Sequence, residues 1–175
     1  MSKLNLKGTF TLEIIRAGKV IHSEVVPNTI TDEGKTALLE AFFNGGASTA
    51  DWYVGLIDDN GFTATAASDL YSQIGGTNGW TEFIGYTDTA NSGGNLTRPE
   101  WMSDPATVSI SNGTTASFDI TQAGNLQGLF IAGGTAAATK GDNSTGTLWS
   151  AASFVGGVRA VAVNDSLKVT YTVAT

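Results

Sequence analysis

Alternation of apolar and polar residues is the feature that most constrains how this chain can fold. Near its start Phe10, Leu12 and Ile14 alternate with polar residues, and Leu167–Val173 repeats the pattern near its end. Successive side chains of a β-strand point to opposite faces, so a period of two indicates strands with one buried face. With about eight such strands, the pattern predicts one mainly β domain over 1–175, an antiparallel, jelly-roll-like β-sandwich with one short α-helix packed on it.

Turn-forming residues divide the strands. Ala17-Gly18 predicts a hairpin between the first two strands, because glycine accepts the positive φ that a tight turn requires. Asn112-Gly113 predicts a second hairpin between the strands on either side of it. Between these hairpins, 62–105 is rich in Gly, Thr, Ser and Asn, and we expect a loop-rich excursion with a short helix near Ser68–Ile74. Residues 1–7 are expected to form an extended arm.

One segment has the pattern of a helix. Thr31 can cap its start, Asp32 and Glu33 lie in the first turn, and Gly45-Gly46 ends it. Gly34 costs about 1 kcal/mol relative to Ala, which packing must outweigh. The apolar side chains form a wide stripe that suits a helix lying against a sheet: Leu38, Leu39, Ala41, Phe42 and Phe43.

Composition excludes several classes of protein. Hydrophobic residues make up 41% of the 175 residues, which argues against disorder. A net charge of −7, with scattered Lys and Arg, argues against nucleic-acid binding. The chain has no Cys, so its stability must come from packing or assembly. No stretch has the length of a membrane helix and the start lacks the apolar core of a secretory signal, so we expect no membrane partner and synthesis in a cytoplasm.

Few residues offer catalytic or metal-binding chemistry. His22, the one His, is in phase with the alternation of its strand and is interpreted as a partly exposed strand residue. The segments Asp58–Gly61 and Gly141–Asn143 contain clustered oxygen ligands, but the spacing of an EF-hand is not met. We therefore predict no metal site, no cofactor and no catalytic residue.

Two tryptophans of the excursion each have an acidic neighbour. Glu82 and Glu100 could act as acid and base in a glycosidase if they faced each other across a sugar ring. The favoured interpretation is that these carboxylates pair with Arg98 or cap loop backbone, while the tryptophans pack. If exposed, Trp80 and Trp101 could instead stack on sugar rings.

Six segments stand out in order along the chain: Asn28–Lys35, Trp52–Ile57, Gly79–Glu82, Arg98–Trp101, Gly146–Ala151 and Leu167–Thr172. Their order resembles small virion proteins of tailed bacteriophages. The resemblance implies a structural virion component, either a head decoration (cement) protein or a tail or fibre component, and it transfers no catalytic residue. The Gly/Ala-rich stretch Gly133–Gly146 is longer than the family pattern.

The leading hypothesis is a non-enzymatic decoration protein, made in the cytoplasm of the bacterial host and located in the virion. It would bind the outside of the head and bridge capsomers, since each added interface stabilises by mass action. Its partners would be the major capsid protein, or tail proteins of the same virion, and further copies of itself in a dimer or trimer. The alternative is a tail or fibre component that binds glycan through exposed tryptophans. The candidate interface combines the arm, which could add a strand to a neighbour's edge, with the excursion: Lys3, Leu4, Leu6, Trp80, Arg98 and Trp101.

Overall fold

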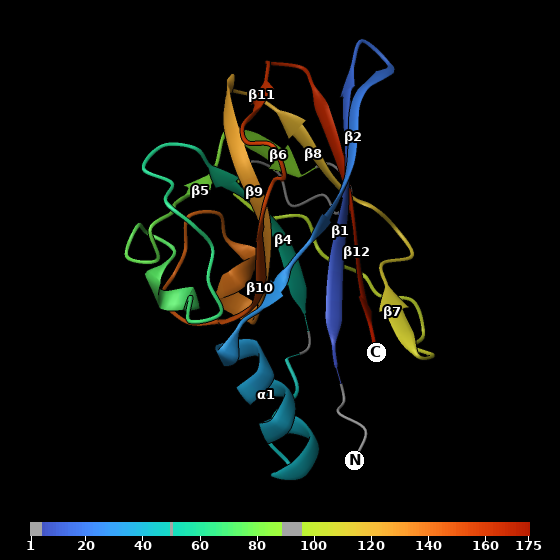
Figure 1. Ribbon diagram of the computed structural model, residues 1–175, viewed down its shortest axis with the longest axis vertical. Coiled ribbons are helices and arrows are strands. Elements are labelled where there is room, and N and C mark those ends of the chain that lie inside the picture. Colours follow the sequence, from blue (N-terminus) through green and yellow to red (C-terminus); the bar gives the residue numbers. More distant parts are fainter. Residues whose placement is uncertain (1–4, 50, 89–95) are drawn as a thin grey trace.

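Two antiparallel β-sheets lie face to face in the computed structural model, which describes residues 5–49, 51–88 and 96–175 (Figure 1). The strands of the first sheet are β1 Lys7–Arg16, β2 Lys19–Pro27, β6 Tyr86–Asp88, β7 Ser109–Ser111, β8 Ala116–Ile120 and β12 Ser166–Ala174. Those of the second are β3 Thr29–Ile30, β4 Trp52–Asp58, β5 Glu82–Phe83, β9 Gly124–Gly133, β10 Thr147–Ser153 and β11 Arg159–Val161. The helices are α1 Asp32–Phe43 and the 3₁₀ helices η1 Tyr71–Gln73 and η2 Thr135–Ala138.

The strand order is β2-β1-β12-β8-β6 in the first sheet, where β7 also pairs with β12. In the second sheet it is β3-β10-β9-β4-β5, and β11 also pairs with β9. The predicted β-sandwich with one short α-helix is confirmed. More strands are present than the eight or so expected, because β3, β5, β6, β7 and β11 are two or three residues long and too short to show alternation in the sequence.

The main core lies between the two sheets. β1 and β12 are antiparallel neighbours, with Phe10 opposite Tyr171 and Leu12 opposite Val169. These side chains are buried, as the alternation predicts. The hairpin at Ala17-Gly18 is also confirmed, since β1 pairs with β2 and both turn residues have positive φ.

The second predicted hairpin, at Asn112-Gly113, is wrong. β7 and β8 lie end to end along β12 and do not pair with each other. The side chain of Asn112 bridges the gap between them: its Oδ1 accepts from the backbone N–H of Tyr171 at 2.8 Å, and its Nδ2 donates to the carbonyl of Val169 at 3.1 Å. The amide thus replaces ladder bonds that buried backbone groups require. Asn112-Gly113 thus separates two strands that both pair with β12. A turn signal in the sequence does not show with which strand its flanking segments pair.

The first part of the excursion, residues 62–80, covers the outer face of the second sheet. Phe130 of β9 points to that face, and its ring centroid lies 5.4 Å from that of Trp80. Both rings are buried with Tyr71 in a second apolar cluster. The short helix expected near Ser68–Ile74 is present as the single 3₁₀ turn of η1.

Helix α1 is attached to the sandwich by its first turn. Thr31 is the N-cap, as predicted, and its hydroxyl oxygen accepts from the backbone N–H of Gly34 at 3.0 Å. The Glu33 carboxylate accepts from the backbone N–H groups of Tyr71, at 2.9 Å, and Leu148, at 2.7 Å. Gly34 is the one buried residue of the helix, and a Cβ there would lie 2.8 Å from a carbonyl oxygen of β10. Glycine therefore permits the close approach that anchors α1.

The rest of α1 projects beyond the end of the sandwich (Figure 1). The prediction that its apolar stripe lies against a sheet is wrong, because Leu39, Phe42 and Phe43 are 55%, 78% and 73% exposed. Small side chains, Ala37 and Ala41, line the space between the helix and the sandwich instead. With only the first turn docked, the large apolar residues of the later turns face solvent.

Candidate functional site

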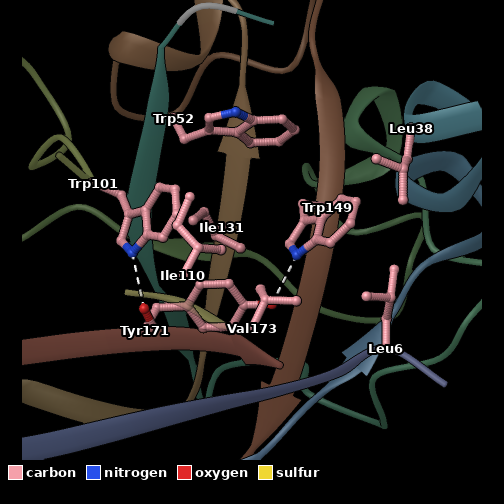
Figure 2. Close-up of a pocket in the computed structure, with 9 residues that line it drawn as sticks. All are labelled: Leu6, Leu38, Trp52, Trp101, Ile110, Ile131, Trp149, Tyr171 and Val173. Carbon is pink, nitrogen blue, oxygen red and sulfur yellow. Dashed lines mark hydrogen bonds between the residues drawn. The ribbon is translucent and has the colours of Figure 1, made fainter. Parts of the chain in front are cut away.

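An apolar cleft of about 300 Å³ opens between the two sheets, at the end of the sandwich that carries α1 (Figure 2). We name it the tryptophan cleft, because three of the four tryptophans of the chain line it. Both sheets, α1, the residues before β1 and the last part of the excursion contribute to its walls: Leu6, Leu38, Trp52, Trp101, Ile110, Ile131, Trp149, Tyr171 and Val173.

The tryptophans of the second sheet are positioned by strand pairing. Trp52 begins β4 opposite Gly133 of β9, where a Cβ would lie 2.6 Å from the Trp52 ring. The missing side chain leaves room for this indole. Trp149 of β10 lies beyond it, with ring centroids 6.0 Å apart in an edge-to-face arrangement that aromatic pairs favour.

Two of the three indole N–H groups of the cleft are bonded to Tyr171. Trp149 Nε1 donates to the Tyr171 hydroxyl at 2.8 Å, and Trp101 Nε1 donates to the Tyr171 carbonyl at 3.0 Å (Figure 2). Asn28 donates to the same hydroxyl at 2.8 Å. Burial raises the pKa of Tyr171 to about 12, so the phenol is neutral at physiological pH. The cleft therefore presents apolar surface, which suits an apolar group better than a sugar or an ion.

An exposed apolar surface on α1 adjoins the cleft. Leu38 lines the cleft itself, and Phe42 follows it by one turn on the same side of the helix. Phe43 packs edge-on against Phe42, with ring centroids 4.9 Å apart. We name the exposed residues Leu39, Phe42 and Phe43 the α1 face. Contiguous exposed apolar surface of this kind marks interaction sites.

The opposite end of the molecule carries a second group of exposed aliphatic residues, in the hairpin of β1 and β2 and in the loops on either side of β11 (Figure 1). Arg159 holds this end together: its Nε donates to Glu24 on β2 at 2.7 Å, and its Nη2 donates to the carbonyl of Val155 at 2.8 Å. Arg16 forms a two-pronged pair with Asp165, with both N···O distances 2.7 Å. We name the exposed residues of this end the valine end: Val20, Ile21, Val155, Val158 and Val163.

The residues predicted to form an interface fall into three groups. Leu6 and Trp101 line the tryptophan cleft, so the structure brings them together. Trp80 and Arg98 are wrong as interface residues, because they are 0% and 1% exposed, and Trp80 Nε1 donates to Asp69 at 2.8 Å inside the second cluster, which agrees with the favoured interpretation that this tryptophan packs. This excludes Trp80 as a ring for sugar stacking in the described conformation.

The expected extended arm 1–7 lies partly outside the described residues, which begin at Asn5; Lys3 and Leu4 fall in that part. Where the arm is described, it is not free. Lys7 pairs with Ala174 in β1, and Leu6 packs against the main core.

Arg98 and Glu82 form a buried ion pair, with Nη2 2.8 Å from Oε2 and Nε 2.8 Å from Oε1. Arg98 also donates to the carbonyl of Ala137 at 2.7 Å, and Glu82 accepts from the Tyr86 hydroxyl at 3.0 Å. Burial alone would lower the pKa of Arg98, but the bonds to Glu82 raise it above its ordinary value. The predicted pairing of a carboxylate with Arg98 is confirmed for Glu82, and that carboxylate is not free for acid–base chemistry.

The other candidate groups are also tied into the structure. His22 is partly exposed on β2, as predicted, and its Nε2 lies 2.9 Å from Glu24 and 3.0 Å from Arg159 Nε. In the described ranges, no group of three or more His, Cys, Asp or Glu residues is placed to hold a metal ion. Over the same ranges, no helix has the length and apolar character needed to cross a membrane.

Sequence reasoning missed Trp52, Trp149 and the α1 face as surface features. Both tryptophans occur near the start of a strand, where a side chain can lie at the open end of a sandwich, but this signal does not identify the end. Phe42 and Phe43 are adjacent, so a stripe that includes both is too wide to be fully covered by one sheet. That width was the available signal.

Comparison of the chain with protein-family models and with curated proteins finds no match. The function is therefore inferred from the apolar surfaces at the two ends of the sandwich.

Proposed function

We propose that this chain is a non-enzymatic structural protein of a phage virion, a decoration protein that binds the outside of the head and bridges capsomers. The observation that carries the proposal is the pair of apolar surfaces at opposite ends of the sandwich. One is the tryptophan cleft with the α1 face, and the other is the valine end. A protein with one docking surface can coat a shell, whereas a protein with two can link neighbours.

The electrostatics of the chain support the same role. Glu82, Glu24 and Asp165 are each paired with an arginine, so these carboxylates serve the fold. The net charge of −7 disfavours contact with packaged DNA and favours solubility before assembly. The sequence resemblance to small virion proteins of tailed bacteriophages points in the same direction.

Binding to heads tests this proposal. Heads assembled without the protein are mixed with the purified wild type, and bound protein is measured after sedimentation. We expect Ile21→Asp with Val158→Asp to lower the affinity at least about tenfold, because charges at the valine end must be desolvated on docking. Ser68→Asp with Ser72→Asp, which adds the same charge at exposed positions of the excursion, is the control and should bind like the wild type.

A reconstruction of the intact particle supplies the second measurement. The proposal expects density for the sandwich on the outer head lattice, with one apolar end on the shell. Failure of the wild type to bind heads, together with density in the tail alone, would contradict it and favour the tail or fibre alternative.

A further inference from the structure

We propose that the α1 end is the interface of a symmetric homodimer, in which Phe42 and Phe43 of each copy enter the tryptophan cleft of the other. The inference concerns the isolated protein in solution and does not depend on the virion role.

The two complementary features lie side by side on one chain. Leu38 lines the cleft, and Phe42 lies one helical turn beyond it on the same side of α1. A protrusion next to a recess meets its own complement when a second copy is rotated by 180°. Such an arrangement forms two identical contacts at once and closes the assembly at two copies.

The phenylalanines of α1 do not fill the cleft of their own chain. Phe42 and Phe43 remain 78% and 73% exposed, although the cleft begins one turn away. The helix is fixed by its first turn, where Glu33 binds two backbone N–H groups and Gly34 lies against β10. The aromatic rings are therefore held outside the cleft of their own chain and presented to another molecule.

Size and chemistry match aromatic rings. An apolar cavity of roughly 150 Å³ accommodates one benzene-sized ring, so a cleft of about 300 Å³ has room for two. Water would find few partners there, because the indole N–H groups of Trp101 and Trp149 are bonded to Tyr171. Edge-to-face packing of Phe on Trp would add to the burial of apolar area.

Charge also favours a second copy at this end. Two molecules that each carry −7 repel one another, so a self-interface must lie where charge is low or paired. None of the residues that line the cleft is acidic or basic. On α1, Asp32 pairs with Lys35 at 2.9 Å and the Glu33 carboxylate faces the sandwich, which leaves Glu40 beside Asn44 as the remaining acidic group.

Sedimentation velocity over a wide concentration range tests the proposal. We expect the wild type to form dimers and Phe42→Ser with Phe43→Ser to raise the dimer Kd about 10,000-fold, since the symmetric pair loses four buried rings and each contributes about a factor of ten. The helix exposes both positions, so the variant should fold, as circular dichroism would check. Val155→Ser with Val158→Ser removes exposed apolar surface at the opposite end and should leave the dimer Kd unchanged.

A complementation experiment keeps the test independent of folding. Leu38→Arg blocks the cleft but leaves the phenylalanines, whereas the double Phe variant keeps an open cleft. A mixture of the two should form a heterodimer with one intact contact, tighter than either variant with itself. Tryptophan emission should shift to the red when the wild type is diluted into monomers, because three of its four tryptophans line the cleft.

Three results would overturn the proposal. The first is a wild type that is monomeric at every concentration, as expected if the cleft receives a different partner. The second is a dimer that survives the double Phe substitution, and the third is a mixture of variants that forms no heterodimer.

Discussion

Arg98 illustrates how far the role of a single residue depends on distant parts of the chain. It forms an ion pair with Glu82, sixteen positions earlier, and 0% and 2% of their side-chain surfaces are exposed. Its further bonds to Tyr71 and to the carbonyls of Ala137 and Asp142 join the excursion to the loop around η2. The sequence suggested a pairing partner for a carboxylate, but it did not show that the pair would be enclosed.

Replacing Arg98 tests this enclosure. Arg98→Ala should lower the free energy of unfolding by about 3–5 kcal/mol, because it leaves the Glu82 carboxylate buried without its counterion. Urea unfolding measures the loss. Lys35→Ala breaks the exposed pair with Asp32 and is the control, expected to cost less than about 0.5 kcal/mol. Equal effects of the two substitutions would show that the Arg98 pair is accessible to water.

Among the elements, α1 departs most clearly from what its sequence suggests. Its boundaries and its Thr31 cap follow from local signals, and they are confirmed. Its orientation does not follow from them, because a stripe of apolar residues indicates burial without naming what covers it. The same limit applies to β7 and β8. The Asn112-Gly113 turn signal was correct as a break between strands, but both strands pair with β12 and not with each other.

Gly34→Ala separates local preference from packing in α1. Alanine is favoured over glycine inside a helix by about 1 kcal/mol. Here the added Cβ would lie 2.8 Å from the Trp149 carbonyl oxygen and force the helix from β10, so we expect a net loss of about 1–2 kcal/mol in the free energy of unfolding. Thr36→Ala, at an exposed position of the same helix, is the control and should change it by less than about 0.5 kcal/mol. A stabilising Gly34→Ala substitution would contradict the tight anchoring of the first turn.

At the scale of the whole molecule, the chain crosses between the sheets after β11. β11 belongs to the second sheet and β12 to the first, and Asp165 lies in the connection. Its carboxylate accepts from Arg16 at the end of β1 and from the backbone N–H of Ala162 at 2.8 Å. The pair thus fastens the last crossover to the first hairpin, near the valine end.

The pH dependence of the free energy of unfolding tests how much the Arg16–Asp165 ion pair contributes to stability. The hydrogen bonds from Arg16 hold the pKa of Asp165 below its ordinary value of 3.8. The folded state therefore binds the proton more weakly than the unfolded state, and the stabilisation is complete above about pH 4 and is lost as the pH falls through the lowered pKa. The difference in unfolding free energy between the wild type and Asp165→Asn should be constant from about pH 7 to pH 4 and shrink below that.

Arg16→Gln removes the same pair from its other side and should give the same pH profile in urea unfolding. A difference that grows as the solution becomes more acidic would contradict the assignment.

Local sequence patterns predicted the strands with one buried face, the first hairpin and the start and end of α1. These properties arise from neighbours within a few positions, such as the alternation of Phe10 and Leu12 or the bond from Gly34 to Thr31. The enclosure of Arg98 and the meeting of Trp52, Trp101 and Trp149 in one cleft became visible only in the folded chain. Strand pairing over long sequence separations sets which side chains share an end of the sandwich, and the alternation of residues within a strand does not show which strands pair.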